Sequence, residues 1–478
     1  VRKSKGANGE TNQGVKDFNQ LPGITSAREF LSFIQKSKLV ADRPDKEVFY
    51  ELIFGQFGDV ARCDHHNAPH VLLGDADHIE LASKKGNCVR SGSYYYNYYR
   101  KQRKYPIALM GGYDSDRDRY LEPVKKWVRN PKIVQSQLEP FKDITKQFIN
   151  YLEPKLDQYT KVCNNLLPLC LMWNFECMVY LLFGQVAGAL TEEGKLGKRF
   201  LQSQRDIGSN EMRLVTNPFA KWFPTRSWTR YTKGLDDWYG ITKELMDADN
   251  EDLTKASLYK FLKSYKYSDG SQLTEVELMV LLSDVLNDAT GNTPMTAVWL
   301  LHDVAKNVDV QEKITEEMKA VSYDVTKSPY LMAVVKESMR LHPTRDCSVV
   351  HVPKGGMAIG GYSIPPGVIL NGVTSNTSLN PRYYEDPMSF KPERWLDESK
   401  EHHKFASCPY GIGPKTCPAS DLGDLQLATF VQVILRRYLL DSDPDEVVEA
   451  QYQPLLAPIA PFDIAFNTRD SLPPNKKK

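Results

Sequence analysis

The residue with the greatest chemical potential in this sequence is Cys417, which lies in a turn that leads directly into a predicted helix. The turn runs from Pro409 to Ala419 and reads PYGIGPKTCPA. A thiolate at the start of a helix is stabilised by the positive end of the helix dipole and by backbone N–H groups. Glycines such as Gly411 let the backbone pass closely beneath a flat ligand. Cys417 could therefore be the axial ligand of a haem iron, and a glycine-rich turn around a buried thiol is the alternative.

A second constellation combines one carboxylate with two guanidinium groups. Glu337 and Arg340 share one face of a predicted helix at i, i+3 spacing, and Arg394 follows in the run FKPERW. A buried carboxylate requires cationic partners, and two guanidinium groups can satisfy its lone pairs. For any single E-x-x-R pair, a solvated surface pair is the commoner case.

The order of these motifs resembles that of the cytochrome P450 family. An E-x-x-R helix is followed by P-E-R-W and then by a G-x-G-x-K-x-C turn that opens a helix. Leu21–Gly23 and Gly361–Pro365 match further motifs of the family, and the resemblance covers nearly the whole chain. Within the family the chain is most similar to the mitochondrial clan. Three stretches carry this likeness: 218–228, 330–343 and 384–396.

The resemblance implies haem b as the cofactor, with Cys417 as the proximal ligand of the iron and the carboxylate–guanidinium triad as a brace below the haem. Five further positions are expected to contact the cofactor: Lys415, His351, Tyr410, Gly411 and Arg117. Lys415 stands where the family usually has an arginine, and a lysine keeps the charge but loses the fork. Arg117 and Leu121 stand in place of the family's W-x-x-x-R motif.

The distal helix, expected from about Thr274 to Asn307, departs from the family pattern. The A/G-G-x-D/E-T motif reads DATGN at 288–292, so glycine and asparagine replace the acid and the alcohol that relay protons during oxygen activation. Asp288 and Asn292 are the candidate catalytic residues. In a dry pocket Asp288 would have a raised pKa and act as acid or base. The alternative is that it points away and is solvated or paired. Pro294 is expected to kink the helix.

The face that binds the redox partner also departs from the clan, which presents lysines and arginines to an acidic ferredoxin. Lys336 is kept, but Met332 replaces one expected lysine. Ser420 and Asp421 replace two arginines just after the cysteine turn. We therefore expect a ferredoxin to be attracted less strongly than in the clan.

Composition and charge are those of an ordinary globular protein. The 478 residues are 41% hydrophobic and 25% charged, with a net charge of +1, which gives no reason to expect binding to nucleic acid. No apolar run reaches the ~20 residues of a membrane span. The eight cysteines form no C-x-x-C pair, which favours reduced thiols.

The predicted fold is mainly α: the cytochrome P450 fold, with a large helical body and a small β-rich region. Residues 1–20 are polar and expected to be disordered, and residues 21–478 are expected to form a single cytochrome P450 domain. Along the chain we expect a hairpin at 58–63 and 69–73, helices over 132–322, short strands over 349–374 and a helix over 418–437.

The function expected from the resemblance is that of an oxidoreductase of the monooxygenase class. It would act on a lipophilic, sterol-like molecule with electrons from a ferredoxin. The resemblance also implies a mitochondrial protein associated with the inner membrane. Because the sequence begins with Val1, we expect that a leader has been removed or left out. The aromatic and basic side chains of Pro218–Trp228 suit a peripheral membrane contact, and a capped helix junction is the alternative.

A rival hypothesis follows from the altered distal helix and docking face. The P450 fold would then persist without ordinary oxygen activation. Such a protein would isomerise or cleave a lipid peroxide, or would be a catalytically silent binding or structural subunit of a protein complex.

Two smaller features complete the candidates. Cys63, His65, His66 and His70 cluster near the predicted hairpin turn, but their spacing matches no standard zinc site, so a solvated turn is favoured. The tyrosine-rich run Tyr94–Tyr99 either lines a pocket entrance or packs in the core.

Overall fold

The computed structural model describes most of the chain. The described residues are 15–26, 28–29, 32–33, 46–64, 69–86, 94–106, 114–216, 225–248, 257–413, 416–443, 445–446, 448–452, 455–458 and 460–469. The chain forms two compact units, each assembled from three separate stretches. The first unit comprises Val1–Val89, Cys347–Tyr383 and His402–Lys415, and the second comprises Arg90–Asp346, Tyr384–Glu401 and Thr416–Lys478. A single domain over 21–478 stays a prediction, and residues 1–14 lie outside the described part.

The first unit is built on a five-stranded sheet. Its strand order is β1 (Gly23–Ile24), β2 (Val60–Cys63), β3 (His70–Leu73), β8 (Ile369–Gly372) and β5 (Ser348–His351). β2 and β3 pair antiparallel, which confirms the predicted hairpin, and β3 pairs parallel with β8. The described part of this unit also contains the helices α3 (Lys46–Phe57), α4 (Ala76–Lys85) and α16 (Thr374–Ser378) and a second hairpin of β6 (Met357–Ile359) and β7 (Tyr362–Ile364).

One hydrophobic core of the first unit lies between the sheet and α4, and a second cluster packs α3 against the sheet. Val71 and Leu73 of β3 alternate in sequence with a residue on the other face, as a strand requires. They pack with Ile79 of α4 and with Leu370 of β8, and all four side chains are fully buried. Sequence segments separated by almost 300 residues are therefore needed to close this core.

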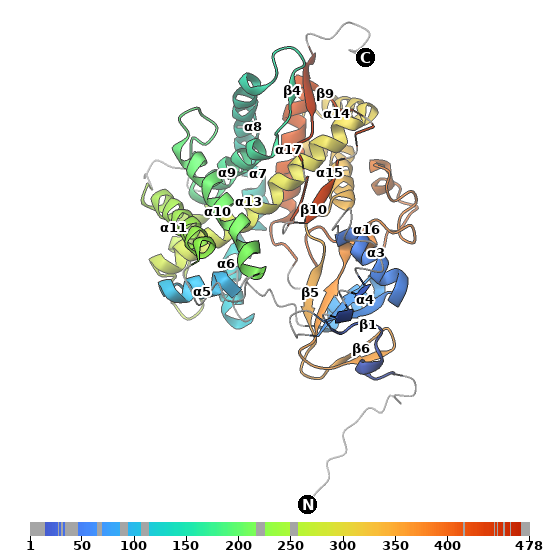
Figure 1. Ribbon diagram of the computed structural model, residues 1–478. Coiled ribbons are helices and arrows are strands. Elements are labelled where there is room, and N and C mark those ends of the chain that lie inside the picture. The colour runs from blue at the N-terminus through green and yellow to red at the C-terminus, as the bar shows by residue number, and fades with distance from the viewer. Residues whose placement is uncertain are drawn as a thin grey trace, which may run out of the picture. The chain divides into compact units, whose positions relative to one another are not determined.

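The second unit is a helical body around α13 (Glu275–Lys306), which packs against α9 (Leu167–Phe183), α11 (Arg226–Asp247), α15 (Pro329–Leu341) and α17 (Ser420–Arg437) (Figure 1). The other α-helices in the described part of this unit are α5 (Tyr94–Arg103), α6 (Asp114–Val128), α7 (Pro131–Ser136), α8 (Leu138–Leu152), α10 (Lys195–Thr216), α12 (Leu258–Ser264) and α14 (Val308–Ala320). The helical reading of 132–322 and the helix predicted over 418–437 are confirmed.

Two small sheets close the second unit. One has the order β4 (Val162–Cys163), β12 (Ile464–Thr468) and β9 (Tyr438–Asp441), and the other pairs β10 (Ala450–Tyr452) with β11 (Leu456–Pro458). Because β12 lies between β4 and β9, the end of the chain joins the segment before α9 to the segment after α17.

The limits of α13 follow from its sequence. Thr274 is the N-cap: its hydroxyl accepts from the N–H of Glu277, while the Glu277 carboxylate accepts from the N–H of Thr274 at 2.8 Å. Asn307 is the C-cap, as the predicted range of 274–307 requires. Pro294 lies inside the helix, which continues on both sides of it. No helix in the described part of the chain is long and apolar enough to cross a bilayer.

Candidate haem-thiolate site

Cys417 lies three residues before the first residue of α17 and is partly buried. The turn that leads to it uses left-handed backbone at Gly411 (φ 80°) and Gly413 (φ 63°), a conformation that favours glycine. The two residues between Gly413 and Thr416, including Lys415, lie outside the described residues. The thiol is thus placed near the N-terminal end of an 18-residue helix, whose dipole favours a thiolate.

Four other cysteines have surroundings that disfavour a thiolate. Desolvation raises the pKa of Cys63 to about 11 and that of Cys408 to about 12. Complete burial raises the pKa of Cys170 and Cys177 well above the ordinary value. These four thiols stay protonated near neutral pH, whereas a metal binds the thiolate. The donor chemistry at Cys417 therefore fits a haem iron best among these five residues.

The structure brings Glu337, Arg340 and Arg394 together. The Glu337 carboxylate accepts from Arg340 Nε at 3.0 Å, from Arg340 Nη2 at 2.7 Å and from Arg394 Nε at 3.0 Å. Two donors that the sequence reasoning did not name complete the cluster: the backbone N–H of Lys391 at 3.0 Å and Trp395 Nε1 at 2.9 Å. Glu337 is fully buried and its charge is matched by five donated hydrogen bonds. The cluster joins α15 to the 3₁₀ helix η4 (Pro392–Trp395).

The candidate catalytic residues lie one helical turn apart on α13, and both are half-buried. Asn292 Nδ2 donates to the backbone carbonyl of Asp288 at 2.8 Å. The hydroxyl of the intervening Thr290 is buried and donates to the Leu286 carbonyl at 2.6 Å. Both donors are therefore engaged by the backbone of their own helix. The Oδ1 atom of Asn292 remains as a hydrogen-bond acceptor, and Gly291 supplies no side chain in place of the family's acid.

A buried chain of amides connects the helix that follows Cys417 to the distal helix. Gln426 Nε2 on α17 donates to Asn174 Oδ1 on α9 at 2.9 Å, and Asn174 Nδ2 donates to the Ala289 carbonyl on α13 at 3.1 Å. Sequence reasoning did not find this chain. The signal was the presence of Asn174 and Glu176 inside the apolar run Leu166–Gly184. The Glu176 carboxylate is buried, which raises its pKa, and it accepts from two backbone N–H groups.

A second buried network ties α5 to the distal helix. The Arg100 guanidinium forms an ion pair with Asp284, and both side chains are fully buried. Tyr96 donates to Asp284 at 2.9 Å, and Arg100 Nε donates to the Tyr239 hydroxyl of α11 at 3.1 Å. Asp284 lies one turn before Asp288. Sequence reasoning missed this network because its members are up to 188 residues apart.

The tyrosine-rich run of α5 divides between the two roles that the sequence left open. Tyr95, Tyr96 and Tyr99 are buried in the helical body. Tyr94 and Tyr98 instead line a pocket of about 860 Å³ beside the first turn of α13.

The remaining candidate cofactor contacts are only partly placed. His351 on β5, Tyr410 and Gly411 belong to the first unit and are half-buried. Arg117 lies on α6, but its side chain is outside the described residues, whereas Leu121 on the same helix is buried. A role of these residues in binding the haem propionates therefore stays a prediction.

Lys336 and Asp421 lie on the face that is expected to bind a ferredoxin. The Lys336 amine lies 4.0 Å from the centroid of the Trp395 ring. Desolvation lowers the pKa of Lys336, and the Asp424 carboxylate opposes this shift. Asp421 is exposed in the first turn of α17.

The cluster near the hairpin provides no zinc site in the described residues. His70 Nδ1 shares a hydrogen bond with Asn371 Nδ2 at 3.1 Å, Cys63 lies on β2, and His65 and His66 lie outside the described residues.

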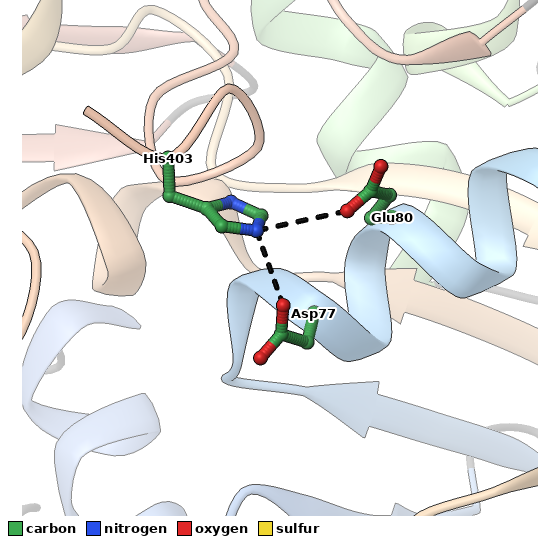
Figure 2. Close-up of side chains that lie close together, drawn as sticks. All are labelled: Asp77, Glu80 and His403. Atoms are coloured by element: carbon green, nitrogen blue, oxygen red, sulfur yellow. Dashed lines mark hydrogen bonds and ion pairs between the residues drawn. The ribbon is translucent and has the colours of Figure 1, made fainter. Parts of the chain in front are cut away.

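Ligand-type side chains gather elsewhere in the first unit, at Asp77, Glu80 and His403 (Figure 2). His403 Nε2 lies 3.2 Å from Asp77 and 3.7 Å from Glu80, while its Nδ1 accepts from the N–H of Phe405. Because Nδ1 accepts a hydrogen bond, Nε2 is the nitrogen that faces the two carboxylates, and the three side chains form a polar cluster in which only Asp77 is exposed.

Comparison with known proteins identifies the family. A sequence model described as Cytochrome P450 matches residues 27–466, so the chain belongs to the cytochrome P450 family. The chain is 25% identical over 384 residues to the mitochondrial 1,25-dihydroxyvitamin D(3) 24-hydroxylase of Mus musculus, covering 78% of this chain and 74% of that protein. It is 21% identical to the mitochondrial cholesterol side-chain cleavage enzyme of Equus caballus, covering 88% and 84%.

A solved structure has the same fold. It is described as retinoic acid bound cyanobacterial CYP120A1, and it matches with a TM-score of 0.75 and 15% identity over 91% of this chain and 96% of that one. The predicted mainly α, P450-type fold and the likeness to the mitochondrial clan are confirmed. Haem b held by a cysteine thiolate is the cofactor of this family, as expected from the sequence.

Proposed function

We propose that this protein is a haem-thiolate oxidoreductase of the monooxygenase class that acts on a lipophilic, sterol-like molecule with electrons from a ferredoxin. The observation that carries the proposal is Cys417 at the start of α17, within a family match that covers 27–466. The mitochondrial relatives support the substrate class, because they are named for a dihydroxylated vitamin D and for cholesterol.

In this proposal each candidate residue has a role. Cys417 holds the iron, and Lys415, His351, Tyr410, Gly411 and Arg117 hold the rest of the haem. When bound, haem supplies the redox-active iron at which dioxygen is activated. The buried Glu337 cluster keeps α15 and η4 fixed relative to each other.

The proton-handling group of the distal helix is Asp288 in this proposal. It is the carboxylate nearest in sequence to the vacant acid position at Gly291. Asn292 would accept a hydrogen bond from water through Oδ1, because its amide N–H already bonds the Asp288 carbonyl. Asp288→Asn should then slow turnover without changing haem content. Turnover equal to that of the unaltered protein would show that Asp288 takes no part in the proton relay.

The test of the cofactor is an absorption spectrum of the purified protein, reduced with dithionite under carbon monoxide. Thiolate ligation gives a red-shifted Soret band, which we expect for the unaltered chain. Cys417→Ala should lose that band, while Cys408→Ala, which changes the residue immediately before the turn, should keep it. A wild-type band typical of a neutral ligand would contradict thiolate ligation by Cys417.

A second candidate function rests on the distal helix. The acid position is Gly291, and the donors of Thr290 and Asn292 bond their own helix. This arrangement favours a P450 that rearranges or cleaves a lipid hydroperoxide, or a silent subunit of a protein complex, over one that activates dioxygen.

One experiment separates the two candidates. The holoprotein is given cholesterol or 1,25-dihydroxyvitamin D3 with a ferredoxin, its reductase and NADPH, and in parallel a fatty-acid hydroperoxide without reductant. Oxygenated sterol that requires the ferredoxin supports the leading proposal. Product from the hydroperoxide alone supports the second, and no product in either arm favours a silent subunit.

We also propose a mitochondrial location with peripheral attachment to the inner membrane. The named mitochondrial relatives support the location. Within Pro218–Trp228 the structure describes only the last residues, of which Trp228 packs 5.5 Å from the Tyr98 ring. Trp222→Ser and Phe223→Ser together should weaken sedimentation with liposomes, and equal sedimentation would favour the helix-junction alternative.

A further inference from the structure

A pocket of about 1020 Å³ in the second unit is lined by five cationic side chains. They come from three elements: Lys142 and Lys146 of α8, Arg436 and Arg437 at the end of α17, and Arg469 just after β12. Among the described residues that line the pocket, Glu139 is the single carboxylate. The whole chain has a net charge of only +1, so this basic pocket concentrates positive charge locally.

Some of this charge is matched by carboxylates. Lys142 pairs with Glu139 at 2.8 Å, and Lys146 pairs with Asp143 at 2.8 Å. The carboxylates of both pairs are exposed, and such pairs contribute little and are screened by salt.

The arginines differ in how they are matched. Arg437 pairs with Glu153 at 2.5 Å. Arg436 and Arg469 have no carboxylate partner among the residues that the structure describes. Neither arginine is therefore neutralised by an ion pair within the described chain, although the Glu312 carboxylate acts on Arg469 from a longer distance and partly opposes the lowering of its pKa.

Arg469 is held in place by hydrogen bonds to uncharged groups. Its Nε donates to the Leu435 carbonyl at 2.6 Å and its Nη2 donates to the Thr315 hydroxyl at 3.0 Å. The side chain is half-buried, and desolvation lowers its pKa. A fixed cation that has lost part of its hydration gains more than an exposed one from a bound anion.

Two neighbours shape the basic pocket around this cation. The Cζ atom of the exposed Arg436 lies 4.6 Å from the centroid of the Tyr323 ring, a cation–π contact that favours this position of the guanidinium group. Gln432 is 3% exposed and lines the same pocket, and its Oε1 has no hydrogen-bond partner in the described structure. A half-turn of this amide, which its broad terminal torsion permits, would present an N–H donor instead. Buried amide oxygens without a hydrogen-bond partner are rare, so this one indicates a missing ligand or water.

We propose that the basic pocket binds a small anion that carries phosphate groups. A guanidinium fork matches phosphate oxygens in pairs, and lysines add point charges around them. A free phosphate ester and the headgroup of an anionic phospholipid share this chemistry. The site goes beyond the proposed oxidoreductase function and does not depend on it, because its residues are not among those assigned to the haem.

The test is isothermal titration calorimetry of the full-length holoprotein with sodium pyrophosphate at low ionic strength. We expect saturable binding that weakens as salt is added. Arg436→Gln should weaken binding about tenfold or more, since a hydrogen-bonded charge is removed. Arg436→Lys keeps the charge but loses the forked guanidinium group. Its affinity for pyrophosphate should lie between those of the unaltered protein and of Arg436→Gln.

The matched control is Arg205→Gln, which removes one exposed arginine of α10 outside the basic pocket. It should bind as the unaltered protein does, and far-ultraviolet circular dichroism should show that all variants are folded. The proposal is overturned if pyrophosphate shows no saturable binding at millimolar concentration, or if Arg205→Gln and Arg436→Gln weaken binding equally.

The source of the phosphate is then separated by two further arms. Liposomes of neutral phospholipid are compared with liposomes that contain an anionic phospholipid, for the unaltered chain and for Arg436→Gln. Retention that requires both the anionic lipid and Arg436 identifies a headgroup. If pyrophosphate binds but retention on anionic liposomes does not depend on Arg436, the ligand of the basic pocket is a free phosphate compound. Because calorimetry needs no turnover, failure of this proposal is distinguishable from failure of the proposed enzymatic activity.

Discussion

Glu337 is the carboxylate on which the α15–η4 connection depends. It accepts hydrogen bonds from two guanidinium groups, one backbone N–H and one indole N–H while being fully buried. A buried charge of this kind is costly unless every partner is present. Glu337 stabilises the fold because its negative charge balances the positive charges of the two guanidinium groups, and not because any single hydrogen bond is strong.

The first prediction concerns Glu337→Gln, which keeps the shape of the side chain and removes its charge. Arg340 and Arg394 would remain buried without a counter-charge, so unfolding should become easier by about 3–5 kcal/mol. Urea titration followed by tryptophan fluorescence measures this difference. Glu385→Gln is the matched control, because Glu385 forms an exposed pair with Lys400 at 2.9 Å. That pair should contribute about 1 kcal/mol or less, and equal losses in the two variants would contradict the assigned role.

The second prediction is a pH dependence that arises at His302. Burial lowers the pKa of His302 to about 4, with Asp303 opposing and with His342 and Lys306 adding to the shift. The unfolded chain has the ordinary value of about 6.5, so below that pH it binds the proton more readily than the folded chain. The contribution of the neutral His302 ring to the free energy of unfolding is complete above about pH 6.5 and is lost as the pH falls toward 4.

His302→Gln tests this dependence. Between about pH 7 and about pH 5 the unaltered chain should lose roughly 2 kcal/mol more stability than the variant. The comparison uses the change with pH and not the absolute stability, because the substitution also removes ring contacts with Phe462 at 4.9 Å. Parallel pH profiles for the two proteins would show that His302 is not buried as a neutral ring.

At the scale of elements, α13 shows which features a sequence reveals. Its start is marked by the Thr274–Glu277 capping box and its length by a sustained apolar pattern, so both could be predicted from local residues. The hairpin of β2 and β3 and the helix α17 were predictable for the same reason. Cys417, Glu337 and Arg394 could be found because each lies in a short motif.

The contacts that bind these elements together could not be read in this way. Arg100 looks like an ordinary basic residue near the end of a polar helix until α13 supplies Asp284 from 184 residues away. Gln426 and Asn174 are likewise 252 residues apart. Partners at such separations leave no periodic signal, and the sequence shows only that a polar residue interrupts an apolar pattern. Whether Asp288 is dry or solvated was undecidable for the same reason.

The third prediction compares two ion pairs that attach α5 to other helices. Asp284→Asn leaves Arg100 buried without a full counter-charge and should cost about 3–5 kcal/mol. Asp236→Asn, the matched control, breaks the pair of Arg103 and Asp236, whose side chains are 48% and 45% exposed. It should cost about 1 kcal/mol or less. Urea titration measures both, and faster proteolysis within α5 in Asp284→Asn alone would show that the buried pair is what attaches this helix.

At the scale of the whole molecule, the chain passes repeatedly between the two compact units. The sheet of the first unit is incomplete without β8 and β5, which follow the long helical stretch of the second unit. The second unit in turn needs β12, near the end of the chain, to lie between β4 and β9. No continuous fragment contains either unit alone, so the architecture favours one cooperative folding event.

The fourth prediction is therefore a single unfolding transition, as the single domain expected over 21–478 requires. All seven tryptophans fall within the second unit, so their fluorescence reports on that unit alone. The first unit is followed through Cys63 and Cys408, whose thiols are desolvated in the folded state. Along a urea series, pulsed alkylation of these two cysteines, read by peptide mass spectrometry, should share its midpoint with the fluorescence change. Alkylation at clearly lower urea would mean that the sheet unit unfolds on its own, and the chain would then comprise two domains.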